Sequence, residues 1–330
     1  MSKEKELIEG IKDEAESYSD DSLYNITSFG TDLPYREIVA MYKDGDLEKP
    51  ELQRKYVWTK NEASRFIDSI LLGLPVPSIF LAKTENDKRL IVDGYQRIMT
   101  VYDYMERGVF AELSEDQKRR IRTSPIHAIV FEQKHPQNDT GMYQIFERIN
   151  TSGRALKPQE IRNCVYHGRF NQFLFELNRE NLWRKVLGSE TEDSRMADVE
   201  LILRFFAFVD ILNRDEMNQK QINLVKYLNE YMSQNSDMPD EEIERKRTLF
   251  IETIGFLYKN IGENVFRTGK EKNNMFSWAK KVNPVVFDAV CTATVLCKDQ
   301  ITDSSLLNKY IELLKDKEFD VVSRQRTTNT

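Results

Sequence analysis

The chain has 330 residues, of which 40% are hydrophobic and 31% are charged, so we expect a globular protein of one large or two smaller domains. The formal net charge of −6 excludes an overall basic surface, and nucleic acid binding would need a local patch. Three scattered cysteines exclude a disulfide framework. The N-terminus lacks the apolar core of a signal peptide, and no apolar run could span a bilayer. We therefore expect a cytoplasmic protein without membrane contact.

The first part of the chain combines a charged stretch with two helix patterns. Residues 1–21 are highly charged and are interpreted as an N-terminal tail. Start and stop signals predict a helix that begins at Thr31 or Asp32 and ends before Gly45. Apolar residues at helical spacing predict a second helix around residues 63–71.

Alternating strand and helix patterns follow. Residues 78–83 and 89–94 are predicted to be two strands around a turn, and a helix is predicted from about residue 95 to 106. Residues 127–132 are a further strand candidate. From residue 141 onward nearly every periodic run is helical.

The fold class that follows is α+β, a small mixed domain followed by an all-α helical domain. We assign residues 1–21 to the tail, 22–155 to the mixed domain, 156–322 to the helical domain and 323–330 to a polar C-terminal tail. No internal repeat or low-complexity block is present.

The stretch "IVDGYQRIMT", residues 91–100, has the chemistry of an anion site. Gly94 permits a tight turn, and the backbone amides that open the next helix favour an anion. Arg97 can add a fork of donors for a phosphate, and Asp93 could hold Mg²⁺ that the phosphate also binds. The structural alternative is that Asp93 caps the helix and Arg97 is a solvated side chain.

A second block, "PELQRKYVW" at residues 50–58, pairs Gln53 with Arg54 and is flanked by Tyr56 and Trp58. Strand alternation would place Arg54 on the same face as the two aromatic rings. The structural alternative is a surface strand with an aromatic edge in the core.

A third block lies in "FERINTSGRALKPQEIRN", residues 146–163. Its loop Thr151-Ser152-Gly153 is rich in donors and can fold into an anion-binding nest. Pro158 starts another helix, in which Glu160 sits early, where the helix dipole favours an acid. A plain helix–loop–helix connector with a glycine cap is the structural alternative.

Several enzyme classes are disfavoured. No GxxxxGK[ST] occurs, which excludes a Walker-type NTPase, and no GxSxG elbow supports a serine hydrolase. The three histidines and three cysteines show no metal-ligand spacing, so a zinc site is not expected.

Four blocks together, "LQRKYVW", "IDSILLGLPVPSIFL", "IVDGYQR" and "FERINTSGRALKPQEIRN", resemble the DGQQR-motif domain family. That domain forms the N-terminal part of GmrSD-type modification-dependent restriction systems and of related phage-defence proteins. The resemblance implies a ParB/sulfiredoxin-like fold, a small α/β unit whose helix starts and arginines hold a nucleotide. It also implies hydrolysis of nucleoside triphosphates with Mg²⁺ or another divalent cation.

The resemblance assigns roles residue by residue. Tyr95 stands where the family usually has Gln. The implied catalytic residues are Asp93, Gln96 and Arg97, with Asp93 also as the metal ligand. The implied nucleotide-binding residues are Gln53, Arg54, Gly94, Tyr95, Asn150, Ser152, Gly153 and Arg154. Sulfiredoxin chemistry is disfavoured, because no cysteine precedes Cys164.

The leading functional hypothesis is a metal-dependent nucleoside triphosphatase that acts as a switch or sensor in defence against foreign DNA. A ParB-like DNA-binding module and a protein-interaction scaffold, both without turnover, are the alternatives. Expected partners are a nucleoside triphosphate, DNA through a local patch, and a partner nuclease or other defence protein. No histidine follows His167, so a C-terminal His-Asn-His nuclease domain is not expected, and we expect no nuclease activity by the chain alone.

Overall fold

The computed structural model describes residues 7–9, 26–49, 56, 58–84, 87–133, 140–149, 156–166, 168–213, 223–272, 275–297 and 306–324. The chain divides into two compact units. We call Ser19–Val165 the sheet unit, and Met1–Tyr18 with Tyr166–Thr330 the helical unit. This division keeps the helix that follows residue 155 with the sheet, whereas the sequence patterns placed the boundary before that helix.

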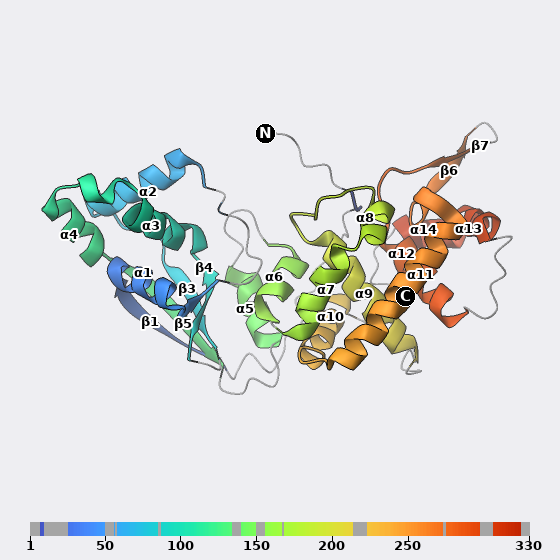
Figure 1. Cartoon of the computed structure of the whole chain (residues 1–330), viewed down its shortest axis with the longest axis horizontal. Helices are drawn as coiled ribbons and strands as arrows, with labels where there is room; N and C mark the ends of the chain where they lie inside the picture. Colours follow the sequence, from blue (N-terminus) through green and yellow to red (C-terminus); the bar gives the residue numbers. More distant parts are fainter. Residues whose placement is uncertain are drawn as a thin grey trace. The chain divides into compact units, whose positions relative to one another are not determined.

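The sheet unit contains both strands and helices (Figure 1). Its strands are β1 (Ile26–Pro34), β2 (Leu47–Glu48), β3 (Ile79–Lys83), β4 (Arg89–Asp93) and β5 (Pro125–Gln133). Its helices are α1 (Tyr35–Asp44), α2 (Lys60–Leu72), α3 (Tyr95–Arg107), the 3₁₀ turn η2 (Val109–Glu112), α4 (Glu115–Thr123), α5 (Thr140–Ile149) and α6 (Pro158–Val165).

The five strands form one mixed sheet in the order β1-β5-β3-β4-β2. β1 pairs with β5, and β3 with β4, in antiparallel fashion, whereas β3–β5 and β2–β4 are parallel. β4 therefore lies inside the sheet, between β3 and β2, and its last residue leads directly toward α3.

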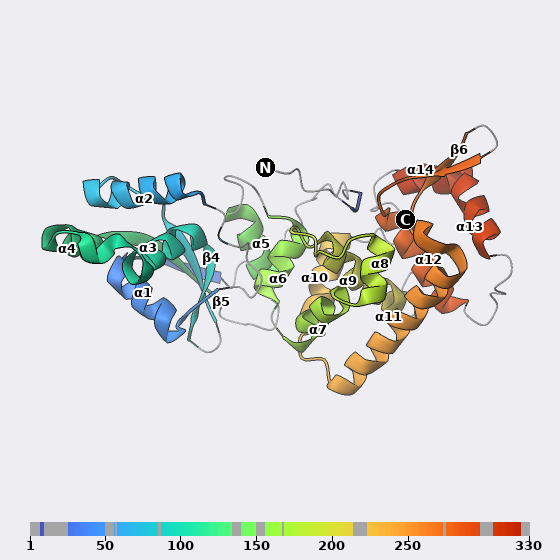
Figure 2. The same ribbon diagram turned by 45° about the horizontal axis from the view of Figure 1, so that its top comes forward.

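One face of this sheet forms the core with helices α1 to α4, which lie together on one side of it (Figures 1 and 2). Alternate residues of β5, Ile126, Ala128 and Val130, are at most 1% exposed and belong to this core. The helices contribute apolar stripes, such as Phe66 of α2 and Ile98 of α3. The α+β fold class expected from the sequence is confirmed.

The expected helix start at Thr31 or Asp32 is wrong. Residues 31–34 belong to β1 and pair with residues 125–128, and α1 begins only at Tyr35. Pro34 is the N-cap, with extended backbone angles of φ −60° and ψ 142°. A proline disfavours helical angles in the residue before it, so Leu33 stays in the strand.

The predicted helix 63–71, strands 78–83, 89–94 and 127–132, and helix 95–106 are confirmed, whereas the strand considered for residues 50–58 lies mostly outside the described residues. β3 and β4 occupy the two predicted strands, α3 runs from Tyr95 to Arg107, and β5 contains the predicted strand 127–132. α2 begins after a capping box, in which Glu62 N–H donates to Thr59 Oγ1 and Glu62 Oε2 accepts from the Thr59 amide.

The helical unit holds the remaining elements, and its helices are α7 (Arg169–Asn178), α8 (Asn181–Leu187), α9 (Ala197–Asn213), α10 (Leu224–Gln234), α11 (Asp240–Ile261), the 3₁₀ turn η3 (Gly262–Asn264), α12 (Pro284–Leu296), α13 (Leu306–Lys315) and α14 (Lys317–Arg324). A hairpin of β6 (Gly269–Lys272) and β7 (Met275–Trp278) interrupts them, which the sequence patterns did not predict. Ile8, from the expected N-terminal tail, forms a parallel bridge with Val282.

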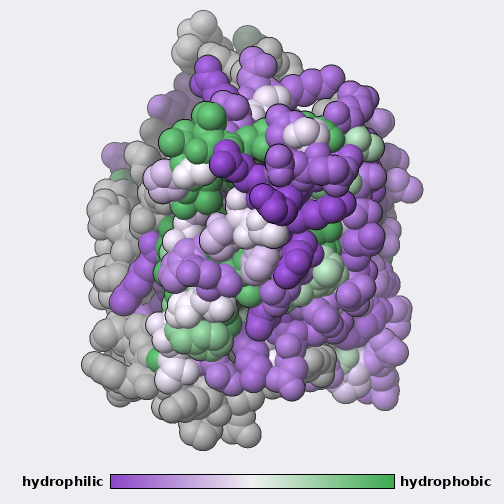
Figure 3. Space-filling model, turned by 90° about the vertical axis from the view of Figure 1, so that its left-hand side faces the viewer, coloured by the Kyte–Doolittle hydropathy of each residue, from purple (hydrophilic) through white to green (hydrophobic). Residues whose placement is uncertain are grey.

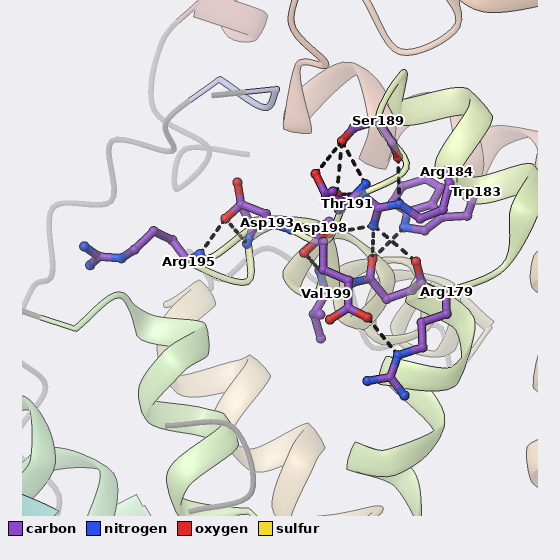
Figure 4. Close-up of polar contacts among 12 residues, drawn as sticks. Arg179, Trp183, Arg184, Ser189, Thr191, Asp193, Arg195, Asp198 and Val199 are labelled. Carbon is purple, nitrogen blue, oxygen red and sulfur yellow. Dashed lines mark hydrogen bonds and ion pairs between the residues drawn. The ribbon is translucent and has the colours of Figure 1, made fainter. Parts of the chain in front are cut away.

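Buried polar side chains connect the helices of this unit. Figure 4 shows Arg184 of α8, whose Nη1 donates to Asp198 Oδ2 at 2.8 Å and to Asn178 Oδ1 at 3.0 Å. Trp183 Nε1 donates to the same amide oxygen of Asn178 at 3.1 Å. Because buried polar groups are costly unless they are paired, this network favours one arrangement of α7, α8 and α9.

The surface of the sheet unit at the end formed by α2 and α4 is mostly hydrophilic, with hydrophobic residues in separate groups (Figure 3). Leu72 and Leu74, at the end of α2, are 62% and 53% exposed. Among the described helices, none is long and apolar enough to cross a membrane.

Candidate functional site at the start of helix α3

A single glycine joins β4 to α3. Gly94 has φ 100° and ψ 7°, a left-handed conformation that side chains rarely adopt. A Cβ atom at this position would lie 2.3 Å from Cγ2 of Ile79, on the neighbouring strand β3. The backbone angle and the lack of room for a Cβ atom therefore both require glycine at this position. The turn places the first amides of α3 directly after the end of β4.

Arg97 is drawn in toward the sheet. Its Nη2 lies 2.5 Å from Asp93 Oδ2 and donates to the Ser78 carbonyl oxygen at 3.1 Å. The Arg97 side chain is 14% exposed and that of Asp93 is 41% exposed. Gly94, without a side-chain hydrogen bond, is the N-cap. The structural alternative is thus wrong on both points: Asp93 does not cap α3, and Arg97 is not a solvated side chain.

Tyr56 and Trp58, the described residues of the second block, contact one face of α3 near Gln96. The Trp58 amide donates to Gln96 Oε1 at 3.3 Å. The Tyr56 hydroxyl lies 2.9 Å from Thr100 Oγ1, and Thr100 donates to the Gln96 carbonyl at 2.7 Å. Since Thr100 has one hydroxyl proton, Tyr56 is the donor of the pair. Residues 56 and 58 thus reach the first two turns of α3.

Tyr95, which stands where the family usually has Gln, packs against the edge of the core. The Lys49 ammonium lies 5.2 Å from the centre of its ring, and its hydroxyl forms a hydrogen bond with Tyr42. Burial raises the pKa of Tyr95, so its phenol stays protonated at neutral pH. Its part in nucleotide binding stays a prediction.

The remaining expected ligands cannot be placed beside residues 93–97, the turn and helix start that we call the corner. Gln53, Arg54, Asn150, Ser152, Gly153 and Arg154 lie outside the described residues. Convergence of all three blocks on one pocket therefore stays a prediction. The start of α6 is described, and there the Lys157 amide donates to Glu160 Oε2 at 2.6 Å. An acidic side chain early in a helix can accept such a hydrogen bond from a backbone amide that precedes it.

Two residues that the sequence did not indicate help to build the corner. Ser78 supplies a carbonyl acceptor for Arg97, and Thr100 links Tyr56 to the helix. Thr100 had a detectable signal, because it lies one helical turn after Gln96 on the same face. Ser78 had none, since its position beside Arg97 depends on the pairing of β3 with β4.

The corner offers one carboxylate to a metal ion. In the described part of the chain, no three His, Cys, Asp or Glu side chains gather where they could hold a metal. Mg²⁺ bound mainly through phosphate oxygens and water needs only one or two protein carboxylates, so Asp93 fits that requirement. The 41% exposure of its side chain leaves the carboxylate accessible.

Cys164 of α6 is the one cysteine in the sequence of the sheet unit. It is buried, and burial raises the pKa of its thiol to about 12. A thiol in that state is not the thiolate that sulfiredoxin chemistry requires.

Comparison with known proteins agrees with the sequence motifs. Residues 35–167 match the family model described as the GmrSD restriction endonuclease, N-terminal domain, which confirms the resemblance. No curated protein matches the chain. A solved structure of a Pnob8-like ParB-N domain aligns over 91% of this chain and 97% of that chain, with 12% identity and a TM-score of 0.24. A TM-score this low carries no argument about fold.

Proposed function

Because residues 35–167 match the model of the GmrSD N-terminal domain family, we propose that the sheet unit binds and hydrolyses a nucleoside triphosphate. The phosphates would lie at the start of α3, with Mg²⁺ held by Asp93. The protein would act in the cytoplasm, as a switch or sensor in defence against foreign DNA, together with a partner nuclease.

The observation that carries this proposal is the corner at Gly94. A left-handed glycine packed against Ile79 is followed at once by the first turn of a helix, where the backbone amides point out of the positive end of the helix dipole. Such amides attract anions, and Arg97 adds a guanidinium in the same turn. Backbone amides and a cation at a rigid turn are the groups that recognise phosphate.

Asp93 and Arg97 have to share this site. The acid repels a bare phosphate and already accepts a hydrogen bond from Arg97. A divalent cation, when bound, neutralises charge on the carboxylate and on the phosphates. Under the proposal, Arg97 then turns part of its guanidinium from Asp93 to phosphate, and Asp93 holds the cation beside it.

The test combines calorimetric nucleotide binding and phosphate release, each with and without Mg²⁺, for the native chain, Arg97→Ala and Asp93→Asn. Arg97→Ala should weaken binding or turnover by roughly tenfold to a hundredfold, the loss of a charge-assisted contact. Asp93→Asn should bind nucleotide more tightly than the native chain without Mg²⁺, because a repelling charge is gone. With Mg²⁺ it should release less phosphate.

Arg107→Ala is the matched control, because Arg107 lies in the last turn of the same helix and its side chain is 74% exposed. It should leave both readouts unchanged. Unchanged binding and turnover in Arg97→Ala would reject the phosphate role. Salt-dependent binding of duplex DNA without phosphate release would instead favour the ParB-like DNA-binding alternative.

A further inference from the structure

Tyr56 presents an aromatic ring beside the corner. The residue is 37% exposed, yet its hydroxyl donates to Thr100, which is 4% exposed. The hydroxyl is therefore anchored at a buried residue, while more than a third of Tyr56 stays exposed. An aromatic ring held in this way has already lost the freedom that ligand binding would otherwise restrict.

The ring lies on the same side of α3 as Gln96. Residues 96 and 100 are one helical turn apart on one face, and Tyr56 is bonded to the second of them. At 1.5 Å per residue, the anchor at Thr100 lies about 7.5 Å along the axis from Tyr95, the first residue of the helix. An extended nucleoside triphosphate can span the gap between the helix start and this ring.

The neighbouring aromatic rings are engaged elsewhere. Trp58 packs edge-on against Phe66, with ring centres 5.5 Å apart, and the ring of Tyr95 is covered by the Lys49 ammonium. Among the described aromatic residues near the start of α3, Tyr56 is thus the one whose exposure best suits contact with a ligand.

We propose that the ring of Tyr56 is a stacking platform for the base of the nucleoside triphosphate. This inference rests on the proposed function, since the phosphates must lie at the start of α3. Every nucleobase has a π face, so stacking contributes affinity with little choice of base. Binding should therefore vary little among the four common bases.

The experiment separates base from phosphates by using ATP and inorganic tripolyphosphate as probes, each with Mg²⁺. Tyr56→Leu should bind ATP about tenfold more weakly than the native chain, with its affinity for tripolyphosphate unchanged. Tyr56→Phe keeps the ring but loses the hydroxyl that anchors it to Thr100, so its affinity for ATP should lie between those of the native chain and Tyr56→Leu. Phe29→Leu, which removes another exposed ring, on β1, is the matched control and should change neither affinity.

Equal loss of affinity for both probes in Tyr56→Leu, or no loss for either, would overturn the platform. If the native chain binds neither probe, the proposed function itself fails, and the platform fails with it. Thermal melting checks each variant. If Tyr56→Leu does not melt cooperatively, the test is the affinity of the native chain for the two probes. The platform requires that the native chain bind ATP more tightly than tripolyphosphate, and equal affinities would reject it.

Discussion

Asp93, the last residue of β4, and Arg97, in the first turn of α3, form an ion pair across Gly94: the carboxylate Oδ2 of the first is 2.5 Å from the guanidinium Nη2 of the second. Each is the charged partner of the other at the start of α3. The two residues expected to hold metal and phosphate are therefore coupled, so a change to either one alters the charge that the other meets.

Arg97→Ala should destabilise the sheet unit by about 1.5–3 kcal/mol, because hydrogen bonds to a charged group are lost and the Ser78 carbonyl loses its donor. Arg107→Ala should change stability by no more than about 0.5 kcal/mol, as expected for an exposed side chain. Urea unfolding of both variants measures the difference. Equal stabilities would show that the contacts of Arg97 contribute nothing to the fold.

Gly94→Ala should be more costly than Gly45→Ala, although both glycines have left-handed angles. A left-handed side chain costs roughly 1–2 kcal/mol at either position. At Gly94 the added methyl also collides with Ile79, whereas nothing lies within 4 Å at Gly45. The collision should add about 1–3 kcal/mol. Denaturant midpoints for the two variants test this, and equal losses would mean that Ile79 moves aside freely.

The N-cap of α2 should lose part of its contribution in acid. Hydrogen bonds from the Thr59 amide and hydroxyl favour the ionised form of Glu62 and lower its pKa. That stabilisation is complete above the ordinary glutamate pKa and is lost as the pH falls through the lowered folded value. Thr59→Ala removes the hydroxyl that favours the ionised carboxylate, so it should be more costly at neutral pH than in acid.

Ser114→Ala provides the matched control for Thr59→Ala. Ser114 caps α4 in the same kind of capping box, but its partner is Gln117, which does not titrate. Its cost should be the same at both pH values. Melting curves of the two variants near neutral pH and below the ordinary glutamate pKa decide the matter. A parallel pH dependence in both variants would contradict the assignment to Glu62.

Removing the acid of a buried ion pair should strongly destabilise the helical unit. Arg204 is fully buried, and its Nε lies 3.1 Å from each carboxylate oxygen of Asp288. Asp288→Ala would leave the guanidinium without this partner, at a cost of about 3–5 kcal/mol. Glu271→Ala breaks the exposed pair with Lys315 and should cost at most about 1 kcal/mol. Similar losses in chemical unfolding would refute this.

Local signals in the sequence determined much of the sheet unit. Helical spacing and a terminal glycine specified α2, and alternation around a turn specified β3 and β4, because these patterns act between residues at most a few positions apart. The motif around Gly94 likewise indicated a strand–turn–helix corner, since only glycine suits its backbone angle. Four such blocks in order were enough to indicate the resemblance that the family model matches over residues 35–167.

Tertiary structure alone decided what the side chains of the corner contact. The Arg97 side chain is only 14% exposed because the pairing of β3 with β4 places the Ser78 carbonyl, 19 residues earlier, beside it. Tyr56 meets Thr100 across 44 residues, and Arg204 meets Asp288 across 84. No short-range pattern encodes such pairs, because they depend on sheet order and helix packing, which arise from the burial of many side chains together.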